Sequence, residues 1–298
     1  MDVDDVGLRI EVIVPHLLQQ HRARDDLAGV LHQIFEQPEL ARLQIEFFVA
    51  ALDRVRQPVE FQVRDPIDGV LATSAAAAKT NAGVAKVITA MQNNVALLNN
   101  GTLVLMMAGQ PDVLDAFARY RATPSSLASL VSEMKALGVS LSTAMAQYIK
   151  PTGARIALVR LPLLSLSPLG QAATETEREA LLQLVVAFND GVTNQAEVDF
   201  DGRQLTLVRT DTLSQQMFDS RTRSSYGISN STDVGCASGR GTAAPLCNTS
   251  YADPTASQGV VNSTVSSVYL WADATHFAPQ AHARLAALVV SNVNRNPL

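Results

Sequence analysis

Short apolar runs alternate with helix-length amphipathic segments through most of this chain, and this alternation limits the folds that it can adopt. The apolar runs contain β-branched residues and are four to eight residues long, as expected of strands buried on both faces. The sequence predicts such strands at 102–108, 154–161, 204–209 and 268–271. It predicts helices at 81–98, 124–149, 174–191 and 279–293. Strands that alternate with helices favour a parallel sheet covered by helices on both faces, which is an α/β fold.

Local signals support two of these helices and one long loop. Thr174 is followed three residues later by Glu177, the pattern of a capping box at a helix start. Pro279 stands at the first turn of the last helix, where its missing N–H costs nothing. Residues 219–266 are rich in Gly, Ser, Asn and Thr, and this segment is too long to be a mere connection.

Composition changes near residue 68, which divides the chain into two parts. Residues 1–68 hold 7 Arg or Lys and 13 Asp or Glu, whereas residues 69–298 hold 16 and 15. The first part carries apolar residues at helical spacing over 25–37 and 38–56, and residues 6–14 alternate well enough to form a strand. We therefore expect a mainly helical segment at 1–68 and an α/β domain at 69–298.

Charge and residue usage exclude several classes of function. The net charge is −5, so there is no basic footprint for nucleic acid, and no apolar run reaches the roughly 18 residues of a membrane span. The start, MDVDDVGLRI, is acidic and lacks the basic and apolar regions of a signal peptide. The first three histidines have no metal-ligand spacing, and no cofactor motif is present.

Asp273 and His276 form the strongest candidate site. They stand three residues apart, between a short predicted strand and the last helix, at the kind of position where sites gather in parallel α/β sheets. A carboxylate beside an imidazole fixes the ring's tautomer and stabilises the imidazolium formed during proton transfer. The alternative is a polar surface turn. His282, on the following helix, is expected to be a surface residue.

Further segments stand in an order that resembles a known family. They are LVLMMAGQPD at 103–112, ARIALVRLPLLSLSP with Leu161 and Pro162, the pair Phe188 and Asn189, the loop at 226–236, and DATHF at 273–277. Over residues 69–298 this chain resembles the SGNH/GDSL ester hydrolases, notably their secreted bacterial lipase-like branch.

The resemblance implies a fold, an activity and a site. The fold would be a three-layer α/β/α domain with a parallel sheet in flavodoxin-like order. The activity would be hydrolysis of lipid or short acyl esters, without a cofactor, by a secreted or periplasmic protein. His276 would be the general base, Asp273 its partner, and Gly109 an oxyanion-hole donor.

Two departures from the family pattern bear on activity. No Gly-Asp-Ser-Leu segment occurs in residues 1–108, so we expect the sheet to lack its usual first strand; alternatively, residues 6–14 supply that strand without a serine. Pro111, which has no N–H, stands where the family has an asparagine. Ser74 is the nearest substitute nucleophile, but a serine before an alanine run is typical of a helix N-cap.

These departures predict a very poor esterase, or else a catalytically inactive, truncated or fused relative with at most a binding role. Because residues 1–68 supply no catalytic group, we also expect that their deletion does not lower activity.

Cys236 and Cys247 are the two cysteines of the chain, and both lie in the polar loop. A local disulfide is one interpretation and implies an oxidising compartment; two free thiols are the other.

Overall fold

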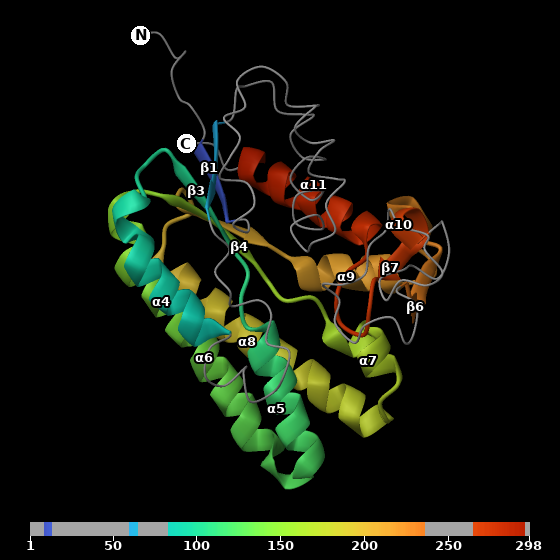
Figure 1. Cartoon of the computed structure of the whole chain (residues 1–298). Coiled ribbons are helices and arrows are strands. Elements are labelled where there is room, and N and C mark those ends of the chain that lie inside the picture. The colour runs from blue at the N-terminus through green and yellow to red at the C-terminus, as the bar shows by residue number, and fades with distance from the viewer. Residues whose placement is uncertain (1–8, 14–59, 65–82, 236–264, 296–298) are drawn as a thin grey trace, which may run out of the picture.

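The computed structural model describes residues 9–13, 60–64, 83–235 and 265–295 (Figure 1). Structural statements below concern these residues. Ser74, Cys236, Cys247 and the helices expected over 25–56 lie outside them. The nucleophile, the disulfide and those helices therefore stay predictions.

The main sheet has five strands in the order β2-β1-β3-β4-β5, and every neighbouring pair is parallel. The strands are β1 (Arg9–Ile13), β2 (Glu60–Arg64), β3 (Thr102–Met106), β4 (Arg155–Val159) and β5 (Leu205–Val208). A parallel sheet is the expected result of strands that alternate with helices. The predicted strands at 102–108, 154–161 and 204–209 are confirmed to within three residues at each end.

The strand β1 lies inside the sheet, between β2 and β3. Arg9 pairs with Glu60 on one side and Thr102 on the other. The expectation that the sheet lacks its first strand is therefore wrong, and the alternative, a strand supplied by residues 6–14, is confirmed. Periodicity could not decide between them, because five residues carry little pattern and their pairing is set by the rest of the sheet.

Side chains of β4 alternate between two separate hydrophobic cores. All five residues of this strand are buried. Ile156 and Leu158 belong to one core, and Ala157 and Val159 belong to the other. A strand buried on both faces loses the polar alternation of a half-exposed strand, so its sequence is a continuous apolar run.

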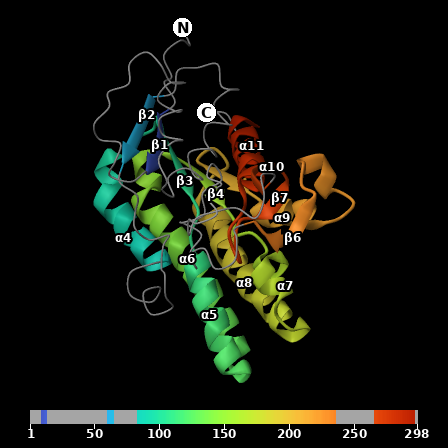
Figure 2. The same ribbon diagram turned by 45° about the vertical axis from the view of Figure 1, so that its right-hand side comes forward.

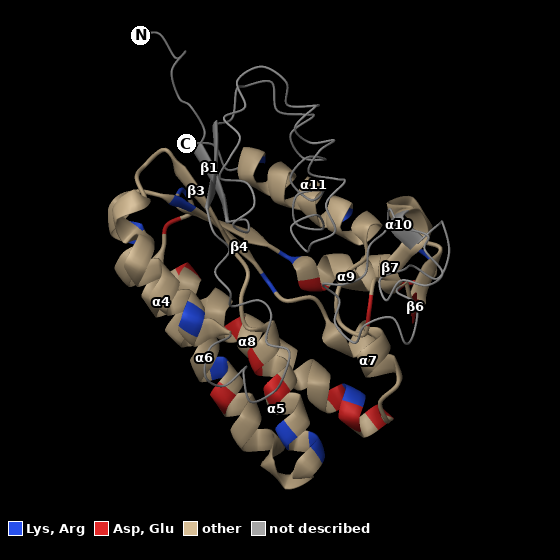
Figure 3. Cartoon of the chain, viewed as in Figure 1, with Lys and Arg blue, Asp and Glu red and all other residues tan. Residues whose placement is uncertain are grey.

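Four helices pack on one face of the sheet (Figures 1 and 2). They are α4 (Val84–Asn94), α5 (Gln110–Ala122), α6 (Leu127–Tyr148) and α8 (Glu175–Asp199). The long helices α6 and α8 approach each other closely at two glycines. A Cβ atom added to Gly138 would lie 2.4 Å from the carbonyl oxygen of Phe188. A Cβ atom added to Gly191 would lie 2.2 Å from the carbonyl oxygen of Lys135. Charged residues of both signs are interspersed on these helices (Figure 3).

The other face carries α9 (Thr210–Phe218) and α11 (Pro279–Arg295), which form the second core with β4 and β5. A small parallel sheet of β6 (Asn230–Val234) and β7 (Tyr269–Trp271) continues this side. The strand β6 lies within the segment predicted to be a loop. Its sequence, NSTDV, has too few apolar residues to predict a strand.

Short helices connect these elements. They are α7 (Pro168–Gln171), α10 (Val265–Val268), and the 3-10 helices η2 (Val95–Leu97), η3 (Pro124–Ser126), η4 (Lys150–Thr152), η5 (Leu164–Leu166) and η6 (Arg223–Tyr226). No helix in the described part of the chain is both long and apolar enough to cross a bilayer.

Candidate functional site

The loop after β7 turns sharply and returns along the strand before α11 begins. The amide of Ala272 donates to the carbonyl of His276 over 2.8 Å, and that of Ala278 donates to the carbonyl of Leu270 over 2.8 Å. The chain therefore reverses within Asp273–His276. The four residues form a tight, hydrogen-bonded turn rather than a free polar loop.

The Asp273 carboxylate stabilises this turn through hydrogen bonds to its backbone. Its Oδ1 accepts the backbone N–H groups of Thr275, at 2.8 Å, and His276, at 2.7 Å. An aspartate that accepts the amide two residues on is an Asx turn, which is why this residue type favours such a reversal. The turn places the His276 side chain directly over the carboxylate.

The expected hydrogen bond between Asp273 and His276 is present. Nδ1 of His276 lies 2.9 Å from Oδ2 and 3.0 Å from Oδ1 of Asp273. A carboxylate can only accept, so the ring proton sits on Nδ1 and the lone pair of the neutral ring is on Nε2. The His276 side chain is 41% exposed and that of Asp273 20%. In the described residues nothing hydrogen-bonds to Nε2, which is therefore the reactive end of the pair.

Asp273 is held in its ionised form. Burial alone would raise the pKa of its carboxyl, but the hydrogen bond and charge of His276, with the amides of Thr275 and His276, outweigh burial and lower the pKa below 3.8. The carboxylate is thus charged at neutral pH and can stabilise an imidazolium.

Aromatic side chains pack beside the turn. The Trp271 and Phe277 rings lie 5.0 Å apart, and the buried Trp271 Nε1–H donates to the Ser231 carbonyl over 3.1 Å. His282 contacts Phe277 edge-on at 6.0 Å and is half-buried, so the expectation of a surface histidine is wrong. Burial, with a smaller contribution from His276, lowers the pKa of His282 to about 4, and this ring is neutral at physiological pH.

The start of α5 lies beside the turn. Gly109 is the N-cap of this helix with φ of 101°. The next residue, Gln110, reaches across, and its Nε2 donates to the Thr275 carbonyl over 3.4 Å. The start of α5 and the His276 turn thus meet at one place, although Gln110 and Thr275 are 165 residues apart in the sequence. Sequence analysis missed Gln110, although an amide side chain next to the candidate oxyanion glycine was a usable signal.

Two features of the chain differ from the pattern of the family that it resembles. Pro111 is in the first turn of α5 and contributes no N–H. Residues 14–20, which follow β1 in the sequence, contain no serine, threonine or cysteine. Among the described residues, the hydroxyl that hydrogen-bonds to the His276 ring is that of Thr275, which lies 3.2 Å from Nδ1 and not at Nε2.

No group of three or more His, Cys, Asp or Glu side chains within the described ranges is placed to hold a metal ion. No model of a known protein family matches this chain, and no curated protein matches it either. The functional proposal therefore rests on the geometry of the Asp273–His276 site.

Proposed function

We propose that this chain is a hydrolase of ester bonds of the SGNH/GDSL type, in which His276 is the general base and Asp273 positions it. One observation carries the proposal: Nδ1 of His276 lies 2.9 Å from an ionised carboxylate, and no residue in the described part of the chain hydrogen-bonds to its Nε2. This is the arrangement in which an imidazole accepts a proton from a hydroxyl or water.

The order of the strands supports the family assignment. β2-β1-β3-β4-β5 is the flavodoxin-like order of doubly wound sheets. Helices on both faces are consistent with the three-layer α/β/α fold that the resemblance implies.

Contacts between the segments that carry the resemblance also support it. The buried Asn189 side chain bonds both backbone groups of Leu161, accepting its N–H at 2.8 Å and donating to its carbonyl at 3.0 Å. A Cβ on Gly109 would fall 2.2 Å from the Phe188 ring. Three motifs that are distant in the sequence are thus packed together, as expected if they belong to one family pattern.

The proposed reaction uses water as the nucleophile. Nε2 of His276 accepts a proton as the water oxygen bonds to the ester carbonyl carbon, and Asp273 stabilises the imidazolium. The imidazolium then returns the proton to the leaving alkoxide as the C–O ester bond breaks. The Gly109 amide is the proposed donor to the carbonyl oxygen. General base catalysis of this kind is worth roughly 10²–10⁴ in rate, so turnover is low.

A second candidate is a catalytically inactive relative whose role is binding. Pro111 at the start of α5 and the lack of a hydroxyl residue after β1 favour it. An active serine enzyme uses the nucleophile, base and oxyanion donors as a unit, and removing one leaves little of the whole effect.

Hydrolysis of p-nitrophenyl butyrate by the full chain distinguishes the two candidates. For the hydrolase we expect slow turnover that falls at least tenfold in His276→Ala and by a similar factor in Asp273→Asn. Lys135→Gln, an exposed position on α6, is the matched control and should leave the rate unchanged. A rate equal to that of buffer, or one that His276→Ala leaves unaltered, rules out the hydrolase and leaves the inactive relative.

A further inference from the structure

The local contacts of the Asp273–His276 turn do not fix its position relative to the rest of the candidate site. Within the described residues, the Asp273 carboxylate hydrogen-bonds only to groups of Thr275 and His276. These bonds orient the imidazole ring over the carboxylate. In the proposed reaction, however, His276 and the Gly109 amide act on the same ester group, so the turn must also be held at a set distance from Gly109.

Two hydrogen bonds at the outer carbonyls of the turn connect it to other elements. The Ala274 carbonyl accepts the backbone amide of Leu169, in α7, over 3.0 Å. The Thr275 carbonyl accepts Nε2 of Gln110, at the start of α5, over 3.4 Å. The first bond joins two backbone groups, whereas the second depends on a side chain. Loss of the Gln110 amide would therefore let the turn shift while the Leu169 bond still holds it.

Gln110 links the two halves of the site directly. It follows Gly109 in the sequence, and its hydrogen-bond partner Thr275 immediately precedes His276. A single hydrogen bond between neighbouring residues thus connects the candidate oxyanion donor to the candidate base. At 3.4 Å this bond is longer than the usual 2.7–3.2 Å of an N–H···O bond, so it adds little to the stability of the whole chain.

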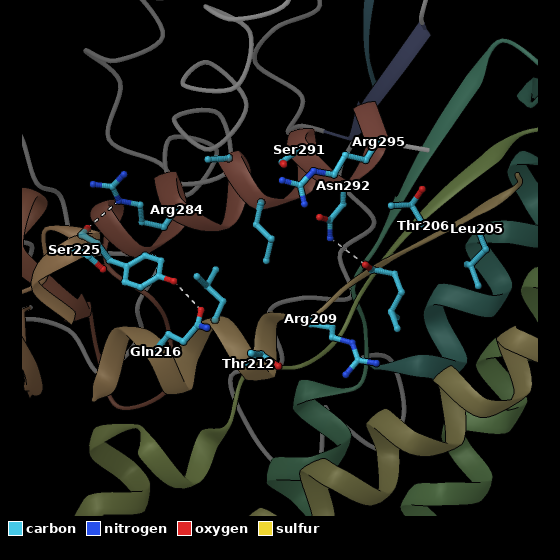
Figure 4. Close-up of a pocket in the computed structure, with 15 residues that line it drawn as sticks. Leu205, Thr206, Arg209, Thr212, Gln216, Ser225, Arg284, Ser291, Asn292 and Arg295 are labelled. Atoms are coloured by element: carbon cyan, nitrogen blue, oxygen red, sulfur yellow. Dashed lines mark hydrogen bonds between the residues drawn. The ribbon is translucent and has the colours of Figure 1, made fainter. Parts of the chain in front are cut away.

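A groove elsewhere in the fold does not help to align a substrate at this turn. The groove, of about 810 Å³, lies at the β5 edge of the sheet between β5, α9, η6 and α11 (Figure 4). Arg209, Arg284 and Arg295 line it together with leucine side chains, whereas no residue of the candidate site does. The alignment of an ester between Gly109 and His276 therefore depends on the contacts of the turn itself.

We propose that Gln110 is a positioning residue, whose side-chain amide sets the separation between the Gly109 amide and Nε2 of His276. This inference rests on the proposed hydrolase function. Gln110 acts through the Thr275 carbonyl and not on the ester. Because a misplacement of about 1 Å between reacting groups can cost on the order of 10² in rate, a weak hydrogen bond at this place has a large effect on turnover.

Two variants of the full chain remove the Gln110 donor without disfavouring the helix. Gln110→Glu keeps the length of the side chain, and a carboxylate favours the first turn of a helix, but it cannot donate to the Thr275 carbonyl at neutral pH. Gln110→Ala removes the amide and places the best helix former there. Gln204→Ala is the matched control, because the Gln204 side-chain amide also donates to a distant carbonyl, that of Lys150, over 3.2 Å.

Hydrolysis of p-nitrophenyl butyrate at pH 7.5 gives the first readout. We expect kcat to fall at least about tenfold in both Gln110 variants with KM within about twofold, the result of losing an interaction that matters only in the transition state. The variants should melt within about 3 °C of the unaltered chain, which excludes a general loss of structure. Gln204→Ala should keep the kcat of the unaltered chain. The positioning role is overturned if kcat of the Gln110 variants stays within twofold, or if Gln204→Ala loses as much.

Backbone amide NMR signals give a second readout that does not depend on activity. In Gln110→Ala the signals of Thr275 and His276 should shift, and in Gln204→Ala they should not. Unchanged signals in Gln110→Ala overturn the role of Gln110, whether or not the chain hydrolyses the ester. If the unaltered chain shows no hydrolysis and the signals do shift, the hydrolase proposal fails and the link between Gln110 and the turn is supported.

Discussion

Two separate constraints make Gly109 hard to replace. Its φ of 101° lies in the left-handed region, and a Cβ there would overlap the Phe188 ring at 2.2 Å. The candidate oxyanion glycine therefore also has a structural role: it lets the end of β3 turn into α5 directly against α8.

We predict that Gly109→Ala lowers the free energy of unfolding by about 3 kcal/mol, because backbone strain and overpacking add. Urea denaturation measures the change. Gly202→Ala is the matched control, since a Cβ there meets nothing within 4 Å, and it should change stability by less than about 1 kcal/mol. Equal effects of the two substitutions would remove the packing argument for Gly109.

Asp112, in the first turn of α5, is a partly buried carboxylate. Its Oδ2 accepts the Val84 amide at the start of α4 over 3.1 Å, and Gly83 packs against the carboxylate. Burial, opposed by this hydrogen bond, raises the pKa of Asp112 to about 6. The folded state therefore binds more protons than the unfolded state between about pH 4 and pH 6.

Because Asp112 binds more protons in the folded state than in the unfolded state, it makes the chain more stable as the pH falls from 7 towards 4. Asp112→Asn keeps an oxygen for the Val84 amide and removes the charge. We predict that it raises the free energy of unfolding at pH 7.5 by about 2 kcal/mol and abolishes the gain between pH 7 and pH 5. Glu179→Gln, at an exposed position of α8, is the control and should keep the pH dependence, as measured by urea titrations at each pH.

Among the elements, α8 has the best-defined start. The Thr174 hydroxyl accepts the Glu177 amide at 3.3 Å, and the Glu177 carboxylate accepts the Thr174 amide at 2.9 Å, so the predicted capping box is confirmed. The helix also runs to Asp199, eight residues beyond its predicted end, because Val192 and Ala196 continue its buried face.

We predict that Thr174→Ala costs about 1 kcal/mol of stability, the usual loss when an N-cap hydroxyl is removed. Ser126→Ala is the matched control, because Ser126 is the N-cap of α6 but its side chain makes no capping hydrogen bond. Thermal unfolding followed by circular dichroism should show a lower melting temperature for the first variant alone. A comparable loss in Ser126→Ala would mean that the cap itself contributes little.

At the scale of the whole molecule, the position of β1 changes what a truncation should do. This strand pairs with β2 and with β3, so residues 1–68 supply one inner strand and one edge strand of the sheet. The expectation that these residues can be deleted without loss of activity is therefore not supported by the structure.

We predict that the chain 69–298 loses cooperative unfolding, because removal of β1 and β2 leaves the edge of β3 unpaired. Ile10→Pro, which removes one N–H from a strand paired on both sides, should lower the melting temperature of the full-length chain by several degrees. A truncated chain that melts as sharply as the full chain would contradict the role assigned to β1.

Local sequence pattern predicted those parts of the fold whose cause is local. Continuous apolar runs predicted β3, β4 and β5, because a strand buried on both faces needs them. The contact between Asp273 and His276 was also predicted because its cause is local. An Asx turn and a three-residue spacing are enough to place the carboxylate beside the ring. The helix α5 was missed because it follows β3 directly and includes Pro111, a residue that also suits loops.

The sequence by itself thus determined the α/β class, the positions of most strands and helices, and the internal geometry of the histidine turn, all of which depend on neighbours within one helical turn or one strand. Only the tertiary structure decided that β1 lies inside the sheet, that Gln110 reaches Thr275, that His282 is half-buried, and that three arginines share a groove with leucines. Each of these depends on contacts between segments far apart in the chain, and no local pattern records which distant segment a residue will meet.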